Sequence, residues 1–207
     1  MRANAQKQKQ LRQMVLLAIL TAVILVLQLA GIGIKLPFLA TPISLVLIPI
    51  TLGAMIVGPW AGAYLGFVFG LEVFIVCGVM GTDAFTAFLF QSTPFMTAVI
   101  CLLKSTLAGF LSGLVFKLLK GKNRIAATFV AAAVTPVVNT GVFILLCLCI
   151  SGTINSFVAA NEMGVSAVYF LIILCAGINF LFEMAINLLL APALNTLYDV
   201  AKRRSRF

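Results

Sequence analysis

Apolar residues occur along this chain in runs longer than the interior of a soluble protein requires. Residues 15–30 and 107–116, for example, contain few polar side chains and do not alternate between apolar and polar positions. A helix needs about 20 apolar residues to cross a bilayer core about 30 Å thick. Backbone amides in lipid must be paired within a helix or a closed barrel, and barrel strands alternate. The pattern therefore predicts membrane-spanning helices.

Six apolar segments are predicted, separated by glycine, proline and more polar residues. Gly31, Gly33 and Pro37 break the chain after the first segment, and Gly58-Pro59 forms a tight turn after the second. Residues 81–93 and 151–164 are predicted to be loops. The helices are expected at residues 11–30, 44–57, 61–80, 94–119, 125–150 and 165–197. The chain is thus predicted to be an all-α integral membrane protein, with residues 1–207 forming a single six-transmembrane-helix bundle.

Composition supports this fold class. Hydrophobic residues make up 63% of the chain and charged residues only 9%, whereas a soluble domain carries about 25% charged residues. So few charges cannot coat a water-facing globule. Five cysteines lie in or next to apolar segments without CxxC spacing, and the chain has no histidine. Neither a zinc site nor any other metal site is predicted, and the cysteines are interpreted as buried apolar residues.

The net charge of +9 reflects orientation in a membrane, because basic residues gather in three clusters that flank apolar segments. A chain with six spans places all three clusters on one side and leaves Lys35 alone on the other. The positive-inside rule then predicts cytoplasmic amino and carboxyl termini, and no nucleic-acid partner. The clusters lie at residues 2–12, 117–124 and 202–206.

Charged residues inside membrane spans are rare and mark functional sites by default. Glu72, Lys104 and Glu183 lie within predicted spans, and Asn139 lies near the middle of the fifth. Asn179 precedes Glu183 by four residues, so the two share one helix face. By their depth, we expect Lys104, Asn139, Asn179 and Glu183 to meet in one interior layer.

Two interpretations of these polar residues stay open. The layer could bind a small solute, or Lys104 could form a structural ion pair with Glu183 or Glu72 while the asparagines join helices. Interhelical hydrogen bonds in membranes contribute only about 0.6 kcal/mol on average, which is a weak reason to keep such residues for stability alone. The residues before the fourth span, Phe85, Phe88, Phe90, Gln91 and Thr93, suit either a pocket for a ring-bearing ligand or an interfacial aromatic belt.

The motifs of several enzyme classes are missing from the sequence. There is no GxxxxGK[ST] phosphate loop, no HExxH and no GxSxG, and only five acidic residues occur. We therefore predict neither ATP hydrolysis nor enzymatic activity by this chain, and no cofactor. Glycines at 62, 66 and 70 in the third span indicate close helix packing, and Ala18 and Ala22 form a small-residue strip on the first.

Three short motifs resemble the substrate-binding S component of energy-coupling factor (ECF) vitamin transporters. The first is Ala18-Ile-Leu-Thr-Ala22 after a basic amino terminus. The second is Leu47-Ile-Pro-Ile-Thr-Leu-Gly-Ala54 running into Gly58-Pro-Trp-Ala-Gly62. The third is Ala108-Gly-Phe-Leu-Ser-Gly113, which leads into the basic turn at residues 117–122.

The resemblance implies a mechanism that hydropathy cannot indicate. An S component captures its vitamin from outside the cell, docks on a transmembrane coupling subunit through its first helix, and is driven by two ATPase subunits in a bacterial plasma membrane. It is thought to topple in the bilayer and release its ligand inside. Ala18 and Ala22 would then be docking contacts, and Gly31, Gly33 and Pro37 would suit a mobile gating loop. The candidate ligand-binding residues are Glu72, Gln91, Lys104, Asn139, Asn179 and Glu183.

The identity of the ligand does not follow from the resemblance. Lys104 suits a carboxylate, as in pantothenate or folate, whereas Glu183 or Glu72 suits a cation or a ring with N–H donors. Pantothenate, riboflavin and folate are therefore the candidates. The competing functions are a stand-alone secondary transporter, which often shows repeated halves, and a membrane assembly factor without enzymatic activity. No repeated halves are evident in this sequence.

Overall fold

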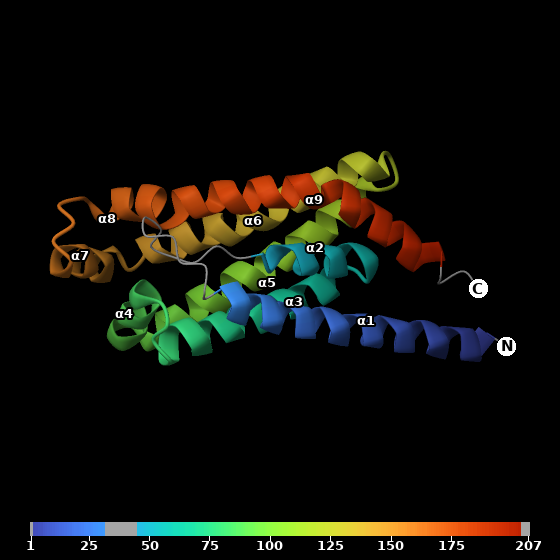
Figure 1. Cartoon of the computed structure of the whole chain (residues 1–207), viewed down its shortest axis with the longest axis horizontal. Helices are drawn as coiled ribbons and strands as arrows, with labels where there is room; N and C mark the ends of the chain where they lie inside the picture. Colours follow the sequence, from blue (N-terminus) through green and yellow to red (C-terminus); the bar gives the residue numbers. More distant parts are fainter. Residues whose placement is uncertain (1, 32–44, 204–207) are drawn as a thin grey trace.

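The structure, a computed structural model, describes residues 2–31 and 45–203, and its secondary structure there is entirely helical (Figure 1). The predicted break at Gly31 coincides with the end of the first helix. Gly33, Lys35, Pro37 and the end of the basic tail lie outside the described residues. Two segments, η1 and η2, are π-helical. The elements are α1 (Arg2–Gly31), α2 (Leu47–Ile56), α3 (Pro59–Val73), η1 (Phe74–Val79), α4 (Ala84–Ser92), α5 (Pro94–Leu119), α6 (Arg124–Leu148), α7 (Ser151–Ala160), α8 (Ala167–Tyr169), η2 (Phe170–Gly177) and α9 (Ile178–Arg203).

Within the described part of the chain, five helices are long and apolar enough to cross a membrane. They are Gln6–Ala30, Pro59–Val79, Pro94–Leu119, Arg124–Leu148 and Ala167–Lys202. The second predicted span is a helix of 10 residues, Leu47–Ile56, which at 1.5 Å per residue is about 15 Å long, half of a bilayer core. The chain is therefore an all-helical, multi-pass membrane protein, and the count of six spans stays a prediction.

Glycines allow α3 and α5 to lie in backbone contact, as the sequence predicted. A methyl group added at Gly66 would collide with the carbonyl oxygen of Ser105, and Gly62 and Gly109 face each other in the same way. Small residues at such crossings let helices approach closely in lipid, where dispersion and hydrogen bonding replace the hydrophobic effect. Before α3, Gly58 adopts a φ of 135° and Pro59 occupies the first turn, which confirms the predicted Gly-Pro turn.

The two predicted loops are wrong, because each contains an amphipathic helix. Residues 81–93 include α4, whose amino terminus is capped by Asp83: its carboxylate accepts a hydrogen bond of 2.8 Å from the Thr86 amide. Residues 151–164 include α7. Each short helix buries its apolar face in one aromatic cluster: Phe85 of α4 lies 5.1 Å from Phe157 of α7 and 5.2 Å from Phe170, measured between ring centroids.

Helix ends also differ from the prediction. α1 begins at Arg2, nine residues before the predicted start, because its polar first turns contain good helix formers that need no apolar face. The last helical stretch continues to Arg203 through the interior Pro192. Four of the five cysteines are buried, as predicted, but Cys149 is exposed at the end of α6.

Basic residues gather at one end of the molecule. Figure 1 shows the start of α1 and the end of α9 at the same end as the turn between α5 and α6, opposite α4 and α7. Lys202 is close enough to Lys9 and Lys120 to interact electrostatically with both. The three predicted basic clusters therefore share one face of the bundle in the described residues.

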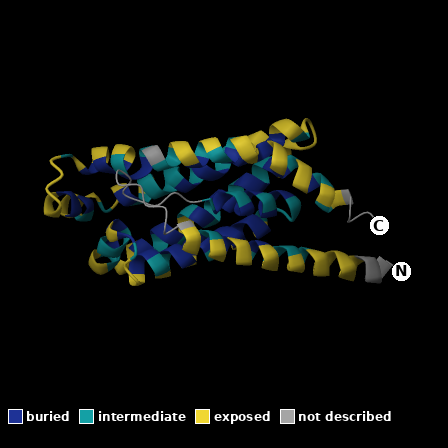
Figure 2. Cartoon of the chain, in the orientation of Figure 1, coloured by how far each residue is buried: buried dark blue, intermediate teal, exposed yellow. Residues whose placement is uncertain are grey.

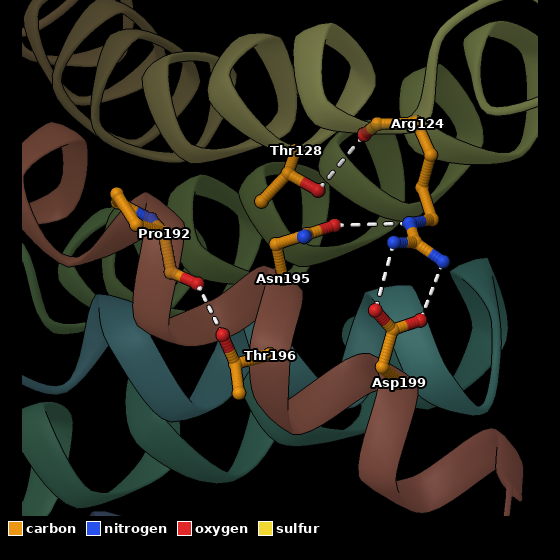
Figure 3. Close-up of polar contacts among 6 residues, drawn as sticks. All are labelled: Arg124, Thr128, Pro192, Asn195, Thr196 and Asp199. Carbon is orange, nitrogen blue, oxygen red and sulfur yellow. Dashed lines mark hydrogen bonds and ion pairs between the residues drawn. The ribbon is translucent and has the colours of Figure 1, made fainter.

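At this end Arg124 joins the first turn of α6 to the last turns of α9 (Figure 3). Its guanidinium makes a two-pronged ion pair with Asp199, and its Nε donates to the Asn195 side-chain oxygen at 3.0 Å. A cation at a helix amino terminus and an anion at a carboxyl terminus each oppose the helix dipole. Arg124 and Asp199 each occupy such an unfavourable position, and their ion pair offsets both unfavourable interactions with the helix dipoles.

We expect this ion pair to contribute modestly to stability, because its side chains are 40% and 31% exposed. In a double-mutant cycle with Arg124→Ala and Asp199→Ala, the coupling energy should be about 1 kcal/mol or less. Thermal unfolding in detergent measures it, and Lys117→Ala, an exposed charge on α5, is the control. A coupling energy of several kcal/mol would contradict this expectation.

Candidate functional site

A polar cavity of about 90 Å³ lies inside the bundle, toward the end covered by α4. Its lining residues come from six helices and from both π-helical segments. Cys77 belongs to η1, and Cys175 and Ala176 belong to η2. π-helical turns are frequent at functional sites. The cavity is lined by Gln28, Phe69, Val73, Cys77, Asp83, Phe85, Thr86, Lys104, Asn139, Thr140, Phe143, Cys175, Ala176, Asn179 and Glu183.

Four of the six candidate ligand-binding residues line this cavity. They are Lys104 of α5, Asn139 of α6, and Asn179 and Glu183 of α9, so the predicted interior layer exists. Glu72 and Gln91 are not among the lining residues. Glu72 is buried in α3, and Gln91 is exposed near the end of α4.

Glu183 is the most deeply buried acid of the cavity, with 3% of its surface exposed. Its Oε1 accepts a hydrogen bond of 3.2 Å from the Asn179 amide nitrogen, one helical turn earlier. Asn187, one turn later, donates to the Glu183 main-chain carbonyl at 2.8 Å. The other carboxyl oxygen, Oε2, has no partner in the structure, and neither has the Asn179 side-chain oxygen. Buried acceptors without partners are costly, so this wall of the cavity is suited to accept hydrogen bonds from a ligand.

Lys104 approaches the cavity from α5. Its Nζ lies 5.0 Å from the centroid of the Phe143 ring, a cation–π contact. Neither Glu183 nor Glu72 comes within the 4.0 Å of Lys104 that an ion pair requires. The structural ion pair considered from the sequence is therefore not formed, and Lys104 retains hydrogen-bond donors for a ligand.

Asn139 ties the cavity to the tightly packed part of the bundle. Ser105 of α5 donates to the Asn139 side-chain oxygen across a distance of 3.4 Å, and the Ser105 carbonyl lies against Gly66 of α3. Both polar side chains are buried. The position of Asn139 at the cavity thus depends on the close crossing of α3 and α5.

Several lining residues were not among the candidates from the sequence. Gln28 comes from the end of α1, Asp83 and Thr86 from the start of α4, and Thr140 follows Asn139. Asp83 was placed in a loop, yet it is buried and caps α4. Asp is a preferred N-cap residue, and an Asp directly before an apolar segment such as residues 84–90 signals a helix start. This signal could have identified α4.

The predicted docking strip on α1 faces outward. Ala18 and Ala22 are both exposed, and Leu11, Val15 and Val26 lie on the same face with exposed side chains. Figure 2 shows the exposed positions continuing along the length of α1. This outer face is apolar, so in the membrane it is available to lipid or to another helix.

Comparison with known proteins identifies the family. Residues 12–195 match the family described as "ECF transporter, substrate-specific component". A solved structure of ThiT from Listeria monocytogenes has a similar fold, with a TM-score of 0.66 and 19% sequence identity over 95% of this chain and 98% of that chain. No curated protein matches the sequence closely. Because the family match covers most of the chain, this protein belongs to the substrate-specific components of ECF transporters, which are substrate-binding subunits and not enzymes.

Proposed function

We propose that this chain captures a water-soluble vitamin in the cavity between α5, α6 and α9 and passes it to the other subunits of an ECF transporter. The observation that carries the proposal is the unpartnered carboxyl oxygen of Glu183, buried inside a membrane protein and facing a polar cavity. Polar groups at such depth are retained where they serve a solute. Pantothenate, riboflavin and folate are the candidate ligands, and Lys104, Asn139, Asn179 and Glu183 are the proposed contacts.

Binding of a whole vitamin requires the cavity to expand. Its volume of about 90 Å³ is well below the roughly 300 Å³ that ligand pockets usually exceed. We propose that α4 and α7 move outward, since α4 contributes Asp83, Phe85 and Thr86 to the cavity wall. After the ligand has entered, α4 and α7 would return and close over it, and their aromatic contacts would form again.

The proposed orientation has both termini and the turn between α5 and α6 in the cytoplasm. The common location of the basic clusters supports it. The cavity would then open toward the outside, at the end covered by α4. Exposed Ala18 and Ala22 on α1 would contact the transmembrane coupling subunit, and two ATPase subunits would drive release.

Isothermal titration calorimetry of the purified chain in detergent tests the binding function. We expect submicromolar affinity for one of the three vitamins, with a matching rise in the unfolding temperature, because a ligand that binds only the folded state stabilises it. Folded protein that binds none of them would contradict the proposal. Vitamin flux through the chain alone in liposomes would instead indicate a stand-alone transporter.

A further inference from the structure

Two walls of the cavity have complementary chemistry. α5 and α9 each pack against α6 and contact each other little or not at all, so Lys104 and Glu183 enter the cavity from separate walls. Asn139 of α6 lies on the wall between them. From the sequence, Lys104 and Glu183 pointed to different ligands. Because both line one cavity without pairing, a single ligand with two different polar ends can satisfy both.

The Lys104 wall offers hydrogen-bond donors and positive charge. Its Nζ contacts the Phe143 ring face and forms no ion pair with Glu183 or Glu72. A lysine ammonium has three donors and no acceptor, and a carboxylate is its natural partner because charge-assisted hydrogen bonds are the strong ones. This wall therefore selects an anionic group.

The α9 wall offers acceptors. Glu183 Oε2 and Asn179 Oδ1 are buried and unpartnered, while Glu183 Oε1 and the Glu183 carbonyl are already occupied by Asn179 and Asn187. The hydrogen bond from Asn179 holds the Glu183 carboxyl group in place. Two free acceptors on adjacent helical turns select a ligand end that carries O–H or N–H donors.

Resting on the proposed function, we infer that the ligand is a compact carboxylic acid whose other end carries hydroxyl or amide donors, bound with its carboxylate at Lys104 and its donors at Glu183 and Asn179. Among the three candidates, riboflavin lacks a carboxylate. Folate has both kinds of group but is much larger than pantothenate, a hydroxylated amide acid. Either acid must widen the cavity of about 90 Å³, and the smaller acid requires the smaller expansion, which favours pantothenate-like acids.

Pantothenate and pantothenol form a matched pair of probes, because pantothenol differs only in an alcohol where the acid has its carboxylate. We expect calorimetry to give an affinity for pantothenate about 10- to 100-fold higher than for pantothenol, the loss of one charge-assisted bond. Lys104→Gln should remove this preference. Lys117→Gln, the same change at an exposed position of α5, should leave it unchanged.

Glu183→Gln should lower the affinity for both probes by about tenfold or more, because an amide replaces one acceptor by a donor. Glu72→Gln is its control, a buried glutamate of a span that does not line the cavity. Thermal unfolding confirms that each variant is folded, and the comparison of the two probes on the unaltered protein needs no variant.

The outcomes separate the two proposals. Tight binding of riboflavin, or equal affinity for pantothenate and pantothenol, would overturn the acid specificity while the vitamin-binding function stands. Binding of folate in preference to pantothenate, lost in Lys104→Gln, would support the acid specificity and overturn the size argument. Folded protein that binds none of these compounds would overturn both the inference and the proposed function.

Discussion

Replacing Ala18 and Ala22 together with tryptophan is expected to reduce vitamin uptake at least about tenfold while leaving ligand affinity unchanged. Both alanines are exposed on α1, and the cavity lining includes only Gln28 from this helix. Small residues four positions apart let a partner helix approach closely, and two indole rings would hold it away. In lipid alone the rings meet no obstacle. Uptake of labelled vitamin by cells that also express the coupling and ATPase subunits measures the effect, and calorimetry measures affinity.

Ala193→Trp is the matched control, since Ala193 is an exposed alanine of α9 in the last candidate span. It introduces one of the same bulky side chains outside the α1 strip, and uptake should stay normal. Normal uptake by the Ala18/Ala22 double variant would show that α1 does not dock through this strip. Equal losses in the double variant and the control would point to a general effect of bulk on the membrane-embedded protein.

Gly66→Ala is expected to lower the free energy of unfolding by about 1–3 kcal/mol, which is the usual cost of overpacking. The added methyl group would meet the Ser105 carbonyl oxygen, which belongs to backbone and cannot rotate away. α3 and α5 must then separate. Because Ser105 donates a hydrogen bond to Asn139, a shift of α5 would also disturb the position of Asn139. Ligand affinity should therefore fall together with stability. Chemical or thermal unfolding in detergent measures the stability.

Gly141→Ala provides the control for this change. Gly141 lies in α6 with no atom within 4 Å of the position a methyl group would take, so the same substitution should be neutral or stabilise the helix by up to about 1 kcal/mol. Equal destabilisation by both substitutions would mean that the loss at Gly66 arises from the glycine-to-alanine change itself and not from the helix crossing.

Local signals in the sequence were sufficient for most helices. Long apolar runs predicted the five long spans. Gly58-Pro59 marked the turn before α3, and the segment predicted at residues 94–119 begins where α5 begins. The same signals failed for α4 and α7, because each is a short helix with a mixed composition. Their stability comes from an aromatic cluster assembled by Phe85, Phe157 and Phe170, and residues so distant in the chain leave no joint periodicity.

The candidate site was predictable in part, because local sequence also gives the depth of a residue along a helix. Depth in the membrane can be counted from a helix end, and this count brought Lys104, Asn139, Asn179 and Glu183 to one level. Depth does not tell which way a side chain points. Glu72 and Glu183 are both buried acids within spans, yet only Glu183 lines the cavity. Gln28 and Thr86 join the site through elements whose packing the sequence does not encode locally.

The amino-acid sequence alone makes this protein a bundle of membrane helices, because burying apolar side chains and pairing backbone amides in lipid depend on composition and length. It also determined which rare polar residues lie deep in the bilayer. That Lys104 and Glu183 share one cavity without forming an ion pair is visible only in the folded bundle. That outcome depends on how α5 and α9 rotate against α6, and the rotation is set by contacts between helices far apart in the chain, such as Gly66 against Ser105.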